Sequence, residues 1–152
     1  MDKEKNIAVL NQLVEINNDR VEGYETAGKE AKSDELKQLF NELRNHSRDN
    51  VEELSREVSL NGGTPTESTK VTGRFFRAWM DLKAALTNNN KHEILSSCEF
   101  GEDAAQKVYN DVLENKTEHL STQQLEMIRK QETTLKADHD KIRSMRDQKV
   151  TS

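Results

Sequence analysis

The chain lacks the features that stabilise small secreted proteins and those that insert proteins into membranes. It has one cysteine, Cys98, in 152 residues, so an internal disulfide is excluded. No apolar run reaches the roughly 18 residues that a membrane-spanning helix needs. The polar residues 1–6 are not followed by the apolar core of a signal peptide. We therefore expect a cytoplasmic protein that makes no use of a membrane.

Residues that interrupt helices are also scarce. The chain has one proline and six glycines, and aromatic residues make up only 5% of it. Strong helix formers are abundant, so long helices are favoured. Hydrophobic residues at 32% and charged residues at 34% would also suit a disordered chain. Apolar residues nevertheless recur every three or four positions, and this spacing predicts a folded, all-α protein.

The charge pattern argues against nucleic acid as a partner. The net charge is -5, from 23 basic and 28 acidic residues. The basic residues are scattered among the acidic ones and form no positive face along a helix. A phosphate-binding loop is not indicated either, because Gly62 and Gly63 lack the flanking glycine and lysine of that motif.

The spacing of apolar residues and the breaks between them predict five helical segments. Ser33 can cap a helix, Gly62 allows a left-handed turn before Pro65, and Ser121 with Gln124 fits a capping box. The predicted helices cover residues 3–31, 34–60, 67–86, 91–114 and 121–146. The segment at 67–86 is a crossover between the second and fourth of these helices.

Short connections force consecutive helices to lie antiparallel, so the pattern predicts two antiparallel hairpins joined by a helical crossover. This is the arrangement of a ferritin-like four-helix bundle, and we expect residues 1–152 to form a single such domain. Phe75, Phe76 and Trp79 of the crossover are expected to seal one end or side of the bundle. If part of this aromatic group is exposed, it would mark a dimer interface.

One helix carries a carboxylate in the middle of its apolar stripe. At helical spacing, Glu102 shares a face with Cys98 and Tyr109. An unpaired buried carboxylate costs several kcal/mol, so Glu102 needs a partner. One interpretation is a structural hydrogen-bonded pair with His139, joined by Tyr24, Tyr109 or Asn17. The other is a metal ion.

Several motifs resemble those of a small bacterial family. The stretches NGGTP at 61–65, RAWMDLKAALT at 77–87 and CEFGEDAA at 98–105, with His139 near the end, are similar to a family of ferritin-like four-helix-bundle proteins, distant relatives of rubrerythrin. That family has no assigned function, so the resemblance implies a fold and no activity. The wider ferritin-like group holds two metal ions with two single glutamates and two Glu-x-x-His motifs.

This metal-binding pattern fits the chain only in part. Glu102 can stand for a single glutamate, but Lys136 lies three positions before His139, where the motif needs a glutamate. We therefore expect no intact two-metal centre and, as the first hypothesis, no cofactor. The alternative is a single iron, manganese or zinc ion held by Glu102, His139 and one of Glu22 or Glu42.

The leading functional hypothesis is a non-enzymatic cytoplasmic protein that self-associates as a homodimer and keeps a degenerate metal site. The rival hypothesis is a metal-binding, redox-active or stress-related protein that uses Glu102 and His139. A third hypothesis is a module that binds another protein through the aromatic residues of the crossover. Stoichiometric metal in the purified protein separates the first two.

Overall fold

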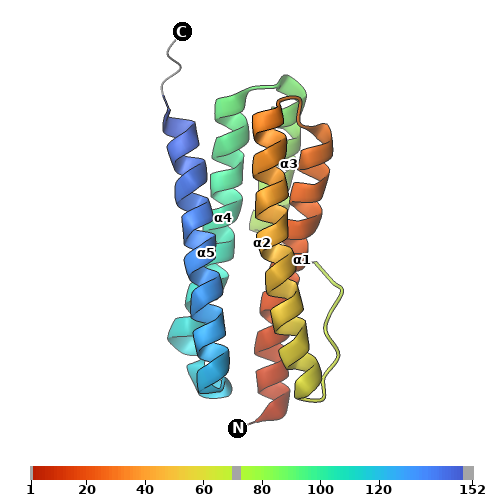
Figure 1. Ribbon diagram of the computed structural model, residues 1–152, viewed down its shortest axis with the longest axis vertical. Coiled ribbons are helices and arrows are strands. Elements are labelled where there is room, and N and C mark those ends of the chain that lie inside the picture. Colours follow the sequence, from red (N-terminus) through yellow and green to blue (C-terminus); the bar gives the residue numbers. More distant parts are fainter. Residues whose placement is uncertain (1, 70–72, 149–152) are drawn as a thin grey trace.

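The computed structural model describes residues 2–69 and 73–148, and within these ranges the chain is all-helical, without a β-strand. Its elements are α1 (Lys3–Glu30), α2 (Asp34–Leu60), α3 (Gly73–Asn88), α4 (Lys91–Asn115), the short 3-10 helix η1 (Thr117–His119) and α5 (Thr122–Asp147). Figure 1 shows α1, α2, α4 and α5 as long helices lying side by side, with the shorter α3 behind them. None of the described helices has a segment apolar enough to cross a lipid bilayer.

Local side chains begin and end the long helices. Asp2 accepts hydrogen bonds from the first turn of α1, and Ser33 accepts one from the first turn of α2. The predicted capping box at Ser121 and Gln124 is confirmed, with both of its hydrogen bonds present. Gly62 has a φ of 85°, the left-handed conformation expected after α2. The four long helices therefore begin and end within one residue of the predicted positions.

The crossover differs from the prediction. It was expected to be helical from residue 67, but α3 begins at Gly73, and residues 66–69 are not helical. Asn11 binds the backbone of Thr64 and Thr66, at 3.1 and 3.0 Å, and Asn18 donates to the carbonyls of Thr66 and Ser68, each at 3.1 Å. These side chains hold the segment against α1 and engage backbone groups that a helix would use. Residues 70–72 and the Phe75 side chain lie outside the described part.

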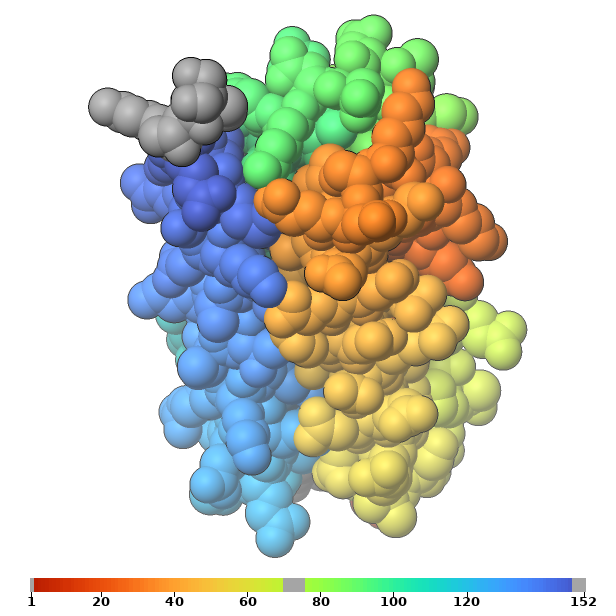
Figure 2. All heavy atoms as spheres, turned by 45° about the horizontal axis from the view of Figure 1, so that its top comes forward, coloured from red at the N-terminus to blue at the C-terminus, as the bar shows by residue number. Residues whose placement is uncertain are grey.

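The interior consists of two apolar clusters with a polar layer between them. One cluster lies at the end where α1 begins, and the other at the end where α1 meets α2 and where α3 packs. The buried polar residues at mid-height are Asn17, Arg20, Ser47, Asn50, Glu102, Gln131 and Asp138. Figure 2 shows side chains of α2 and α5 meeting along a seam on one face of the molecule, which covers the interior from that side.

Candidate functional site

Arg20 lies at the centre of the polar layer, with only 2% of its side chain exposed. Its Nε and Nη2 atoms donate to Oε1 of Glu102 at 3.2 and 2.7 Å. Nη2 also donates to Oδ2 of Asp138 at 3.3 Å, and Nη1 donates to Oγ of Ser47. Because these partners belong to α4, α5 and α2, one guanidinium group links all four long helices.

The charges of this group favour a permanently cationic Arg20. Burial alone would lower the pKa of Arg20, but the negative charges of Glu102 and Asp138 outweigh burial and raise it. Asp138 has a second partner in His46, whose Nδ1 lies 2.9 and 3.0 Å from the two carboxylate oxygens. His46 is partly exposed, so it connects the buried charges to the surface.

Tyr24 is a further hydrogen-bond donor to the Glu102 carboxylate. Its hydroxyl donates to Oε1 of Glu102, the oxygen that also accepts from Arg20. Burial, followed by the nearby charge of Glu102, raises the pKa of Tyr24 well above its usual value, so the phenol stays a neutral donor. The guanidinium carbon of Arg20 lies 5.5 Å from the centre of the Tyr24 ring, within cation–π range. Oε2 of Glu102 is buried and has no hydrogen-bond partner among the described residues.

A second set of hydrogen bonds extends the layer toward the apolar cluster near the start of α1. Asn17 donates to the Tyr109 hydroxyl at 2.7 Å, and this hydroxyl donates to Oε1 of Gln131 at 2.8 Å. Asn50 donates to Oδ1 of Asn17 at 3.1 Å. These bonds again join α1, α2, α4 and α5. Since each depends on the height of one helix relative to another, the layer fixes the register of the packed helices.

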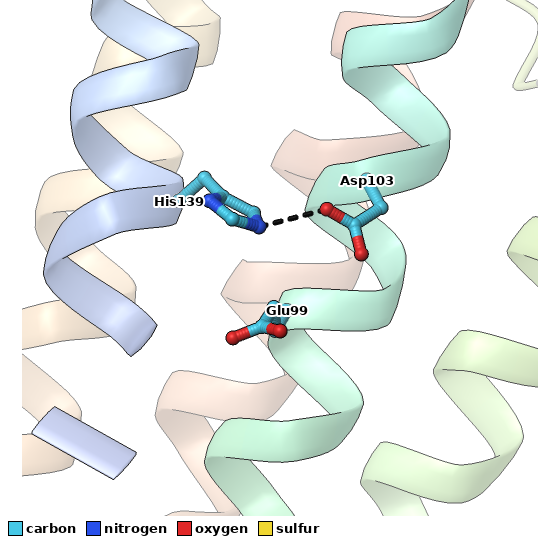
Figure 3. A group of neighbouring side chains, drawn as sticks. All are labelled: Glu99, Asp103 and His139. Carbon is cyan, nitrogen blue, oxygen red and sulfur yellow. Dashed lines mark ion pairs between the residues drawn. The ribbon is translucent and has the colours of Figure 1, made fainter. Parts of the chain in front are cut away.

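The four residues predicted to hold one metal ion do not come together. Glu102 lies in the polar layer, whereas Nε2 of His139 lies 2.7 Å from Oδ1 of Asp103, on the seam between α4 and α5 (Figure 3). Glu22 is exposed on α1, and the exposed Glu42 pairs with Lys141 at 2.6 Å. The predicted ligand set of Glu102, His139 and Glu22 or Glu42 is therefore not assembled.

A comparison with known protein families identifies the family of the chain. The family described as a domain of unknown function, DUF2383, matches residues 5–115. The chain belongs to this family. The DUF2383 match includes Arg20, Ser47 and Glu102 but ends at the last residue of α4, before Asp138. A search of curated proteins found no match.

Arg20 was not predicted to be buried, although its spacing from neighbouring residues within the DUF2383 region indicates a buried position. Arg20 follows Asn17 by three residues and precedes Tyr24 by four, which is the spacing of one helix face. The apolar spacing of this helix instead predicts Val21 at the inward position, but Val21 is only partly buried. An arginine in an acidic, charge-rich helix is typical of the surface, so Arg20 was not assigned to the buried face of α1.

The predicted inner stripe of α5 runs through Leu135 and Ile142, which are fully buried, but also through Glu132 and His139. Asp138 is buried, whereas Glu132 and His139, which were assigned to the inner face, are partly exposed. Asp138 lies three residues after Leu135 and four before Ile142, and both of these are fully buried. His139 fits the same spacing, four residues after Leu135 and three before Ile142, so the sequence pattern does not distinguish the two positions.

A second feature of this DUF2383 member is an apolar groove between α1 and α3. Its volume is about 230 Å³, and Phe76 and Met80 on its rim are each 52% exposed. Trp79 packs between the two helices and donates from Nε1 to Oδ2 of Asp19 at 2.8 Å. Burial raises the pKa of Asp19 to about 6; the bond from Trp79 opposes this rise, and the charge of Glu22 adds to it.

The two walls of the groove carry opposite charges. Asp19, Glu22 and Glu30 stand on the α1 wall, and Lys83 stands on the α3 wall. Glu22, Glu30 and Lys83 are exposed, and no ion pair joins the two walls within the described ranges. The groove thus offers an apolar floor and rim together with charges of both signs, and among the described residues none of these charges has an ion-pair partner.

Proposed function

We propose that the protein is a non-enzymatic helical module that associates with a second copy of itself through the groove between α1 and α3. The observation that carries this proposal is the exposure of Phe76 and Met80, each 52%, beside a cavity of about 230 Å³. Large apolar side chains that gather around a concave surface are typical of an interaction site. Covering them with a partner would remove apolar area from water, which favours association.

Charge complementarity supports a second copy as the partner. In a two-fold dimer, a residue on one protomer meets a different residue on the other, and the same contact occurs twice. A groove with acids on the α1 wall and Lys83 on the α3 wall is self-complementary in this sense. We propose that Lys83 of each protomer meets Glu22 of the other.

The contacts within the polar layer favour a structural role for it over a catalytic role. Two antiparallel hairpins joined by a crossover helix fit the ferritin-like four-helix bundle that we propose for this chain, in which inward-facing carboxylates of relatives hold metal ions. Here the inward carboxylates, Glu102 and Asp138, are bound to the guanidinium of Arg20. A fixed positive charge between them opposes the entry of a divalent cation. We therefore assign the layer to fixing helix register.

Molar mass measured by sedimentation equilibrium tests this proposal on the full chain. We expect a dimer in the micromolar range, and Met80→Glu should shift it to the monomer because it places a charge on the apolar rim. Leu60→Glu is the matched control, because Leu60 is also apolar and exposed, at 73%, but lies at the end of α2 and does not line the groove. A monomeric wild type, or equal dissociation by both substitutions, would overturn the proposal.

A further inference from the structure

We propose that Glu99, Asp103 and His139 form a binding site for one divalent transition-metal ion, such as Zn²⁺, on the seam between α4 and α5. Each residue offers one ligand atom, and these three atoms lie within 4.8 Å of one another. Figure 3 shows Glu99 and Asp103 on successive turns of α4, with the His139 ring reaching toward them from α5. This inference is separate from the proposed self-association, because none of the three residues lines the α1–α3 groove.

The donor set selects the class of ion. Two carboxylates and one imidazole suit zinc, iron or manganese, whereas calcium and magnesium prefer oxygen ligands alone. Donor atoms that share one zinc ion, at about 2.0–2.2 Å from it, stand roughly 3–3.5 Å apart. The three atoms, which lie within 4.8 Å of one another, are therefore within about 2 Å of the separation that one ion requires. Three protein ligands leave the fourth position of a tetrahedral ion for water.

The surroundings of His139 suit a metal ligand. Its Nε2 lies 2.7 Å from Oδ1 of Asp103, and its Nδ1 lies 3.3 Å from Oδ1 of Asp140. Metal-binding histidines usually donate their other ring N–H to a carboxylate, which fixes the tautomer and the ring orientation. With Nδ1–H directed at Asp140, the Nε2 lone pair faces Asp103. A metal ion bound there would be held by this lone pair and by an oxygen of Asp103.

Glu99 pairs with an arginine but remains available to a metal ion. Its Oε2 atom is shielded from solvent and receives no hydrogen bond from any described residue. Nη1 of Arg146 lies 2.7 Å from this oxygen, but without the alignment of a hydrogen bond, and Arg146 also pairs with Asp147 at 3.0 Å. Because Arg146 has this alternative partner, Glu99 can turn to a metal ion without leaving an unpaired arginine.

The site is distinct from the polar layer, although Asp103 directly follows Glu102. Glu102 is fully buried and binds Arg20 and Tyr24, whereas Asp103 is exposed and pairs with His139. Successive residues of a helix are turned by about 100°, so these two carboxylates face different sides of α4. A metal ion on the seam therefore leaves Arg20 and its partners in place.

Isothermal titration calorimetry of the untagged full chain with zinc chloride tests the site. We expect one ion per chain and a loss of at least tenfold in affinity in both His139→Ala and Asp103→Asn. Asp140→Asn should weaken binding by about 10- to 100-fold, the usual effect of removing a carboxylate that orients a metal-bound histidine. Cobalt(II) in place of zinc should give an absorption band that His139→Ala abolishes.

His92→Ala is the matched control, because His92 is an exposed histidine of α4 and belongs to no such group of ligands among the described residues. Its affinity for zinc should equal that of the wild type. No binding by the wild type, or equal losses in His92→Ala and His139→Ala, would overturn the proposal and indicate only non-specific binding to surface histidines. Circular dichroism identifies any variant that fails to fold, and Asp103→Asn, which keeps the side-chain shape, then decides the question.

Discussion

Nη2 of Arg20 lies 2.7 Å from Oε1 of Glu102, and neither side chain reaches solvent beyond 2%. This contact joins α1 to α4 at the height where the two apolar clusters meet. A buried ion pair adds little stability compared with well-packed apolar residues, but losing one partner leaves an uncompensated charge. The pair therefore constrains how the helices align more than it strengthens their packing.

Replacing Arg20 with an apolar residue should destabilise the fold strongly. In Arg20→Met, Glu102 and Asp138 would remain buried without their shared cation, and we expect a loss of about 3–5 kcal/mol. Urea unfolding followed by circular dichroism measures this loss. Arg48→Met, at an exposed position of α2, should change stability by less than about 0.5 kcal/mol. Equal stabilities for the two variants would show that the core carboxylates do not depend on Arg20.

The close contact between α1 and α3 depends on Gly23. A Cβ atom at this position would lie 2.6 Å from Cε2 of Trp79, closer than packed atoms approach. Gly23→Ala should therefore displace the ring, break its hydrogen bond to Asp19 and cost about 1–3 kcal/mol. Because Trp79 is the only tryptophan, its fluorescence emission should shift to longer wavelength.

Gly28→Ala on the same helix is the control for this prediction. A Cβ atom there would meet nothing closer than Oδ1 of Asn41 at 3.7 Å, an ordinary contact. Alanine is favoured over glycine inside a helix by about 0.5–1 kcal/mol, so this variant should be slightly more stable than the wild type. An unchanged Trp79 emission in Gly23→Ala would contradict the described packing.

Asp19 should make both fluorescence and stability depend on pH. Its pKa is raised by burial from 3.8 to about 6 in the folded chain, so the folded state binds this proton more strongly than the unfolded state. The contribution of Asp19 to stability is therefore complete below about pH 4 and falls as the pH rises through about 6. A titration of Trp79 fluorescence should show a midpoint near 6 that disappears in Asp19→Asn. A midpoint near 4 would indicate an exposed carboxyl group.

The ends of the helices could be predicted because they depend on neighbouring residues. Ser33, Gly62 and Ser121 act within one turn of the helices that they begin or end, so their effect is visible in the sequence. The start of α3 could not be predicted in this way. The preceding segment is held by Asn11 and Asn18, which lie about fifty residues earlier in the chain, and no local pattern reveals such contacts.

The residues of the candidate sites could likewise be predicted only in part from the sequence. The apolar stripe of α4 indicated that Glu102 is buried, but its cation, Arg20, is charged and was not considered for the interior. On α5, Asp138 and His139 both fit the three-and-four spacing between the buried Leu135 and Ile142, and the sequence does not decide which of them faces inward. The group of Glu99, Asp103 and His139 depends on how α4 and α5 pack together, and the sequence does not show which residues of the two helices meet.

The most direct test of self-association uses two charge-reversed variants, Lys83→Glu and Glu22→Lys, mixed in equal amounts. Each variant alone should associate about tenfold or more weakly than the wild type, because each reversal makes two symmetry-related contacts repulsive. In the mixture, a dimer of one chain of each kind has only attractive contacts at these positions. Sedimentation equilibrium should therefore recover the dimer mass in the mixture. A mixture that stays as dissociated as its two components, or single variants that associate like the wild type, would contradict the proposed interface.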